Sequence, residues 1–222
     1  MIEIHTHILP GIDDGSPCVD MSLAMLREEK RQGVSAVVLT PHFYAFRNSP
    51  EEFLDRRNRA WQQLLDAWTP DLPELHLGAE VRYYEGICQL PELSRLCMDG
   101  GETLLLEMPF SPWSRQMVRD ILELEGRSRV ILAHIERYFS FAPGEAWQLL
   151  REQGVAMQCN ASFFLNWKTR RKALGMYRRG EVDFLASDCH NLTTRPPELG
   201  PAWEYIRKIR SSPYKNIGDK ER

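Results

Sequence analysis

Histidines and carboxylates recur at the ends of short apolar runs in this chain of 222 residues. Neutral imidazole and carboxylate oxygen form the ligand set expected for zinc, manganese or iron. A histidine taken alone is more often a hydrogen-bonded structural residue, but a whole series is not explained that way, because buried charges are costly unless paired or metal-bound. The candidate metal ligands are His5, His7, Asp14, His42, Glu80, Glu107, His134, Asp188 and His190.

Short apolar runs alternate with longer amphipathic segments, which is typical of βα units with parallel strands. The expected strands lie at 2–5, 36–40, 75–79, 103–107, 130–133, 155–159 and 184–187. The expected helices lie at 20–31, 50–68, 114–125, 143–153, 169–179 and 197–210, and we expect 81–99 to be irregular. The pattern predicts an α/β barrel, in which the carboxyl ends of the strands open on one face and bring the candidate ligands together.

Composition limits the classes of protein that remain. Hydrophobic residues make up 43% and charged residues 27%, as in ordinary globular proteins, and the net charge of −3 argues against nucleic acid as a partner. No signal peptide or membrane-spanning run is evident, so we expect a cytoplasmic protein without membrane insertion. The five cysteines do not suggest a disulfide framework. We expect one domain at 1–210 and a flexible tail at 211–222, and a homo-oligomer is left open.

Longer motifs surround the candidate ligands. They are HTH at 5–7, DDG at 13–15, TPH at 40–42, GAE at 78–80, LLEMPF at 105–110, AHIERY at 133–138 and SDCHNLTTRPP at 187–197. This set resembles the polymerase-and-histidinol-phosphatase (PHP) superfamily. Within that superfamily it is most similar to the metal-dependent tyrosine phosphatases of bacterial capsule and exopolysaccharide synthesis. The sequence departs from the family pattern at 110–113 and after 210.

The resemblance implies a fold and a cofactor. The fold would be a distorted, TIM-like, seven-stranded (β/α) barrel of PHP type. The cofactor would be three divalent ions, with manganese the first choice and iron, zinc or magnesium as alternatives. One ion would take His5, His7, Glu80 and Asp188, a second Glu80, Glu107 and His134, and a third Asp14, His42 and His190. The implied substrate is the phosphotyrosine-bearing tail of a bacterial tyrosine kinase that controls polysaccharide synthesis and export.

Two arginines stand next to the predicted ligands and are the candidate catalytic residues. Arg137 follows His134 in AHIERY, and Arg195 follows His190 in the last motif. A guanidinium can hold two phosphate oxygens in a fork, and three divalent ions would outweigh the four carboxylates, so an anionic substrate fits. The alternative is that these arginines form surface salt bridges to Glu136 or Glu198.

The motif at 187–197 is also compatible with a different mechanism, that of cysteine-dependent phosphatases. Cys189 and Arg195 have the C-x5-R spacing of cysteine-dependent phosphatases. Pro196 and Pro197 remove amide donors beyond the arginine, and the loop between has no glycine, so this chemistry is the weaker hypothesis. Two further alternatives are a histidinol-phosphatase-like small-molecule phosphomonoesterase and a metal-binding regulatory module without turnover.

Aromatic residues follow two of the predicted ligands. They are Phe43, Tyr44, Phe46, Phe110 and Trp113. Such side chains could flank the phenyl ring of a phosphotyrosine by offset or edge contacts. The alternative is ordinary packing at the barrel rim.

Overall fold

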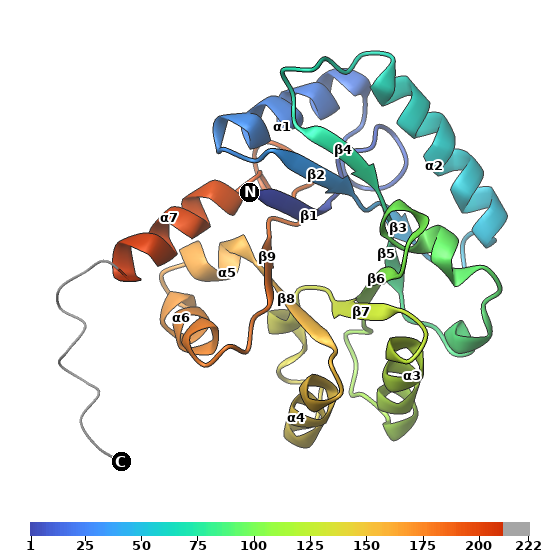
Figure 1. The fold of residues 1–222 in the computed structure, drawn as a ribbon, viewed down its shortest axis with the longest axis vertical. Coiled ribbons are helices and arrows are strands. Elements are labelled where there is room, and N and C mark those ends of the chain that lie inside the picture. Colours follow the sequence, from blue (N-terminus) through green and yellow to red (C-terminus); the bar gives the residue numbers. More distant parts are fainter. Residues whose placement is uncertain (211–222) are drawn as a thin grey trace.

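The fold is a curled parallel sheet with helices along its outer side (Figure 1), in a computed structural model that describes residues 1–210. The expected tail at 211–222 lies outside the described residues. The strands are β1 Ile2–Thr6, β2 Ala36–Leu39, β3 His42–Phe43, β4 Glu74–Leu77, β5 Glu80–Arg82, β6 Thr103–Glu107, β7 Arg129–Leu132, β8 Ala156–Asn160 and β9 Phe184–Ala186. Every strand pair within residues 1–210 is parallel, so the predicted α/β class is confirmed.

The strands form two sheets that approach each other at the first and last strands. Their orders are β1-β2-β4 and β3-β5-β6-β7-β8-β9. Backbone contacts connect the two sheets where β1 and β9 end: the Asp188 amide donates to the His5 carbonyl at 3.0 Å, and the His7 amide donates to the Cys189 carbonyl at 2.9 Å. These bonds place the first and the last strand of the chain next to each other.

Two of the seven expected strands end early and are each followed by a second short strand, which is a correction to the sequence prediction. The strand expected at 36–40 ends as β2 at Leu39, and β3 begins beyond Pro41, which has no amide hydrogen to give to a ladder. The strand expected at 75–79 ends as β4 at Leu77, and β5 begins beyond Gly78, where a Cβ would lie 3.3 Å from the Thr40 side chain. The break places His42 directly opposite Glu80 in the β3–β5 register.

The helices agree with the expected positions to within a few residues. They are α1 Val19–Arg31, α2 Pro50–Leu65, α3 Arg115–Glu125, α4 Gly144–Glu152, α5 Ala161–Leu165, α6 Arg170–Arg178 and α7 Leu199–Arg210. The short α5 was not expected, because its single turn gives no helical periodicity to detect. Between β5 and β6 the chain forms only short 3-10 turns, so most of the segment expected to be irregular is so.

Apolar side chains of the helices pack on the outer side of the sheet. Leu26 of α1, Leu64 of α2, Leu124 of α3 and Leu150 of α4 are all fully buried in one core cluster with the strands. This burial is the main favourable term holding the strands in place, and the strand ends carry the polar residues described next. No helix within residues 1–210 is long and apolar enough to cross a membrane.

Candidate metal centre

All of the predicted ligands lie together in one cluster, most of them at or just after the carboxyl ends of strands. His5 lies in β1 and His7 just after it, His42 begins β3, Glu80 begins β5 and Glu107 ends β6. His134 follows β7, Asp188 and His190 follow β9, and Asp14 lies in the loop after β1. All are buried except His42, which is partly exposed, and Asp14, which is exposed. The sixth histidine, His76, lies outside the cluster and pairs with Asp99.

Glu80 lies at the centre of the cluster. Its Oε2 atom lies 3.3 Å from His5 Nε2, 3.2 Å from His7 Nε2 and 2.8 Å from His42 Nδ1. Its Oε1 atom lies 2.9 Å from His134 Nε2. A single carboxylate that faces four imidazoles has the placement that a bridging ligand requires.

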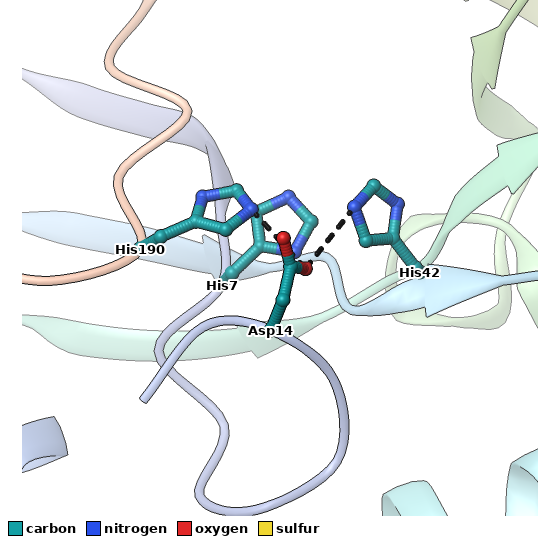
Figure 2. A group of neighbouring side chains, drawn as sticks. All are labelled: His7, Asp14, His42 and His190. Atoms are coloured by element: carbon teal, nitrogen blue, oxygen red, sulfur yellow. Dashed lines mark ion pairs between the residues drawn. The ribbon is translucent and has the colours of Figure 1, made fainter. Parts of the chain in front are cut away.

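Three overlapping groups of side chains could each hold an ion. They are His5, His7 and Glu80; His42, Glu80 and Glu107; and His7, Asp14, His42 and His190, and the ligand atoms within each group lie within 4.8 Å of one another. Figure 2 shows the third group, in which His190 and His42 each lie 3.5 Å from Asp14. The groups overlap the three predicted ligand sets but differ from each: the first lacks Asp188, the second has His42 in place of His134, and the third adds His7.

Several atoms of the cluster are buried with no hydrogen-bond partner. Within the described residues these include Glu80 Oε2, Glu107 Oε2, His42 Nδ1 and His190 Nε2. The 2.8 Å contact between His42 Nδ1 and Glu80 Oε2 therefore does not have hydrogen-bond geometry. Unsatisfied buried oxygen and nitrogen atoms are costly, and metal coordination is a standard way of satisfying them. The residues present thus fit divalent ions with nitrogen and oxygen ligands.

The outward nitrogens of three histidines are held by hydrogen-bond acceptors. His5 Nδ1 lies 3.1 Å from Gln158 Oε1, His7 Nδ1 lies 2.8 Å from Asp13 Oδ2, and His190 Nδ1 lies 3.0 Å from the Asp188 carbonyl. Each acceptor takes the Nδ1 hydrogen, which leaves the Nε2 lone pair facing the cluster. Metal-binding histidines are oriented in the same way by outer contacts.

Asp13 contacts two site histidines, His7 and His42, although only its neighbour Asp14 was predicted as a site residue. Asp13 Oδ2 also accepts from the His42 amide at 3.0 Å, and Oδ1 accepts from the Gly15 amide at 3.0 Å. Only glycine fits at position 15, because a Cβ there would lie 2.1 Å from the His7 carbonyl oxygen. The DDG turn therefore packs closely against the His7 backbone. Asp13 contacts the outer nitrogen of His7, whereas Asp14 faces His42 and His190 inside the cluster.

Both predicted catalytic arginines contact the same carboxylate. Arg137 Nη2 lies 2.6 Å and Arg195 Nη2 lies 2.8 Å from Asp188 Oδ2, and Asn160 Nδ2 donates to the same oxygen at 2.9 Å. Within residues 1–210 neither arginine has a salt bridge to Glu136 or Glu198, the partners that the alternative named. Burial favours a raised pKa for Asp188, but the charges and hydrogen bonds of His5 and His7 hold that pKa well below its usual range.

Two site residues lie in left-handed backbone conformations. His134 has a φ of 32° and Asp188 a φ of 54°. Residues other than glycine adopt this region at a cost, and such strain is found mostly at functional sites. Each residue lies two positions after the last residue of a strand, His134 after β7 and Asp188 after β9, so the change of backbone direction there turns their side chains into the cluster.

The aromatic residues divide into core and rim. Phe43 is fully buried against Phe53, and Trp113 is buried beside Tyr138, so for these two the alternative of packing applies and neither is placed to flank a substrate ring. Tyr44 stacks on His42 at 4.9 Å between ring centroids, and Phe110, 45% exposed, stacks on His134 at 6.2 Å.

Beside Phe110 lies a cation that the sequence analysis missed. Arg82 Nη1 is 2.9 Å from Glu107 Oε2, and its guanidinium carbon lies 5.0 Å from the Phe110 ring centroid. The alternation of side chains along β5 places Arg82 on the same face as Glu80. Because residues 81–99 were expected to be irregular, there was no expected strand to which this alternation could be applied.

Cys189 does not have the environment of a nucleophile. Its side chain is fully buried and its thiol donates to Glu29 Oε1 at 3.7 Å, on helix α1. Burial, together with the charges of Glu29 and Glu3, raises the pKa of this thiol well above its usual value. A thiol that stays protonated cannot attack phosphorus, which removes the support for the cysteine chemistry.

A comparison with models of protein families finds one family that matches almost the whole chain. Residues 1–217 match the family model described as "Capsular polysaccharide synthesis, CpsB/CapC". The chain belongs to the CpsB/CapC family. Membership agrees with the resemblance drawn from the motifs, and it extends through every strand and every predicted ligand.

Individual CpsB/CapC relatives cover most of the chain. The tyrosine-protein phosphatase YwqE of Bacillus subtilis is 31% identical over 208 residues, which is 88% of this chain and 79% of YwqE. The tyrosine-protein phosphatase CpsB of Streptococcus pneumoniae is 30% identical over 94% of this chain and 90% of CpsB. A crystal structure from work on YwqE and CpsB as "unique metal-dependent tyrosine phosphatases" aligns with a TM-score of 0.79 and 26% identity, covering 96% of this chain and 89% of the other.

Proposed function

We propose that this CpsB/CapC protein is a metal-dependent protein tyrosine phosphatase whose active site is the candidate metal centre. The single observation that carries the proposal is the set of buried, unpartnered carboxylate and imidazole atoms around Glu80. The relatives named as tyrosine-protein phosphatases support the reaction class. Three divalent ions, manganese first among them, would be held by His5, His7, Asp14, His42, Glu80, Glu107, His134, Asp188 and His190.

The protein's own residues would bind and orient the phosphoryl group. Bound divalent ions supply charge neutralisation and the activation of water for attack on phosphorus. Arg137 and Arg195 meet at Asp188 Oδ2, and their side chains are about one third exposed, so each has donors left for an oxygen of the substrate. Charge on the phosphoryl oxygens would be stabilised there, where most of the barrier reduction in phosphoryl transfer arises.

The substrate of the proposal is phosphotyrosine on the tail of a tyrosine kinase that controls capsular or exopolysaccharide synthesis. Tyr44 stacks on His42 and Phe110 stacks on His134, so both rings lie next to the cluster. Rings in these positions can flank a phenyl group. The ligand set itself is buried, so a long phosphotyrosine side chain would reach it more easily than phosphoserine. We place the reaction in the cytoplasm, where all five cysteines would stay reduced as they are in the structure.

We further propose that residues 1–210 form one catalytic domain built on a distorted seven-stranded barrel. In this description β2 with β3 and β4 with β5 each count as one interrupted strand. The isolated parallel bridge between Thr6 of β1 and Cys189, just beyond β9, supports it.

The substrate assignment is tested with matched peptides. Phosphotyrosine, phosphoserine and phosphothreonine peptides of one sequence, together with histidinol phosphate, are compared with metal-loaded protein. The proposal predicts the highest kcat/KM for phosphotyrosine. A higher value for phosphoserine or histidinol phosphate would instead support the small-molecule or broader phosphomonoesterase.

A further inference from the structure

The segment that contains α6 carries an unusual concentration of positive charge. Residues 167–180 read WKTRRKALGMYRRG and contain no Asp or Glu. We call its cations the basic face: Lys168, Arg170, Arg171, Lys172, Arg178 and Arg179. All six are exposed. The chain as a whole has a net charge of −3, so its overall composition does not reveal this local excess of positive charge.

The geometry of α6 turns this charge outward. Ala173 and Met176 are buried and anchor the helix to the core. Arg171 and Arg178 are seven residues apart, close to two full turns, so they project in nearly the same direction, away from the buried side. Lys172 and Arg179 have the same spacing and flank them. The helix therefore presents two parallel rows of cations to the solvent.

Internal ion pairs neutralise little of the basic face. Within residues 1–210 only Arg179 has a salt bridge, to Glu181 at 2.6 Å. Lys168, Arg170 and Lys172 lie over the rings of Trp167, Tyr205 and Phe139 and keep their full charge. Arg171 and Arg178 have neither kind of contact within the described residues. Unneutralised cations held together on one surface attract an extended anionic partner.

Trp167 adds an apolar anchor at the edge of the basic face. Its side chain is 72% exposed, the second highest value among the exposed large hydrophobic residues of the described chain. An indole ring with this exposure beside lysine and arginine is the combination found at membrane interfaces, where the ring sits at the level of the lipid headgroups.

A hollow between α4 and α6 extends the same surface. Its volume is about 610 Å³, and its walls include the apolar side chains Phe139, Trp147 and Met176. Arg151, Lys172 and Arg179 also line it, with Glu152 and Glu181 as the counter-charges. Apolar and cationic side chains that line the same hollow suit an amphipathic anionic molecule better than a purely polar one.

We propose that the basic face, with Trp167 and the hollow beside it, binds the surface of a membrane rich in anionic phospholipid. Clusters of four to eight Lys or Arg residues bind such surfaces electrostatically. A nucleic acid or an acidic protein would use the charge but would not require both the exposed indole and the apolar hollow. The inference goes beyond the proposed phosphatase function and does not depend on it. In Figure 1, α6 lies on the outer side of the fold, on the side away from α2.

The test is co-sedimentation of the full chain with phospholipid vesicles. Vesicles of phosphatidylcholine containing about one third phosphatidylglycerol should bind the protein at low salt, and high salt should release it. Pure phosphatidylcholine vesicles should not bind it. The double variant Arg171→Glu/Arg178→Glu should bind at least about tenfold more weakly. Trp167→Ala should weaken binding severalfold, and tryptophan emission should shift to the blue when wild-type protein binds.

The matched control is Arg27→Glu/Arg59→Glu, which makes the same charge change at exposed positions on α1 and α2 that have no salt bridge within residues 1–210. This control should bind vesicles like wild type. Both double variants should hydrolyse p-nitrophenyl phosphate at the wild-type rate, which verifies their folding. Failure of wild type to bind anionic vesicles would overturn the proposal. So would equal loss in the control, or binding to single-stranded DNA or polyglutamate in preference to vesicles.

Discussion

Arg137 Nη2 lies 2.6 Å from Asp188 Oδ2, the oxygen that also accepts from Arg195 and Asn160. The other oxygen, Oδ1, faces His5 and His7 at 3.5 Å and 3.4 Å. One carboxylate therefore joins the candidate ligands to the candidate catalytic arginines. A phosphoryl group bound by the arginines would be held directly beside the cluster.

Arg137 and Arg195 are predicted to stabilise the transition state and therefore to raise kcat. Arg137→Ala and Arg195→Ala should each lower kcat by about 10²-fold, the usual effect of removing one donor that stabilises transition-state charge. Each lysine variant should recover part of the rate, because it restores the charge but not the fork. Metal content, measured by mass spectrometry, should stay at the wild-type level because Asp188 Oδ1 still faces the histidines. Wild-type rates in both alanine variants would return the arginines to a structural role.

The thiol of Cys189 is predicted to be dispensable. Cys189→Ser should keep most of the activity, because the thiol is buried against Glu29 and points away from the cluster. Asp188→Ala, one residue away, should lose nearly all activity and serves as the comparison. Steady-state rates on a phosphotyrosine peptide decide between them. An inactive Cys189→Ser protein that is folded and metal-loaded would restore the cysteine chemistry.

Asp13 is predicted to set metal affinity without binding metal itself. It fixes His7 through Nδ1 at 2.8 Å and the His42 backbone at 3.0 Å. Asp13→Ala should weaken metal binding by about 10–100-fold, as outer contacts of metal ligands do. A manganese titration should restore much of the activity at high metal concentration. The same titration on Asp14→Ala should recover less, since a proposed ligand is gone. Unchanged affinity in Asp13→Ala would contradict the positioning role.

The location of most candidate ligands could be predicted from the sequence, because parallel strands end on one face whatever their exact lengths. The sequence could not predict that Asp13 and Asp14 take different places, since this depends on the contact between Gly15 and the His7 backbone. Gln158 also contacts two site histidines from the middle of β8, where nothing in the local sequence distinguishes it from core. The sequence could not decide whether Phe43 and Trp113 face the substrate or pack in the core, because an aromatic residue after a strand can turn to either side.

Buried Glu29 is predicted to make stability depend on pH. Burial, with the charge of Glu3, raises the pKa of Glu29 well above its usual range. The folded state therefore keeps this proton to a higher pH than the unfolded state, whose pKa is about 4.3. Stability from this group is complete below the unfolded pKa and is lost as the pH rises through the folded pKa.

The glutamine of the variant Glu29→Gln cannot ionise, so this variant should not lose the folding stability that wild type loses at high pH. Its melting temperature relative to wild type should increase as the pH rises, by about 2–4 °C for each 1 kcal/mol regained. Glu28→Gln is the control, because the hydrogen bond and charge of Arg31 lower the pKa of Glu28 and the substitution should bring no gain at high pH. Parallel pH profiles for Glu29→Gln and wild type would show that Glu29 ionises normally.

The central claim is that catalysis takes place at the cluster around Glu80 and requires its metal ions. The most direct measurement is the rate of phosphate release from a phosphotyrosine peptide by one protein preparation before chelation, after verified metal removal, and after addition of manganese. The account predicts a fall to the uncatalysed background when the metal is removed and a return of activity with manganese. Full activity in the verified metal-free protein would contradict it.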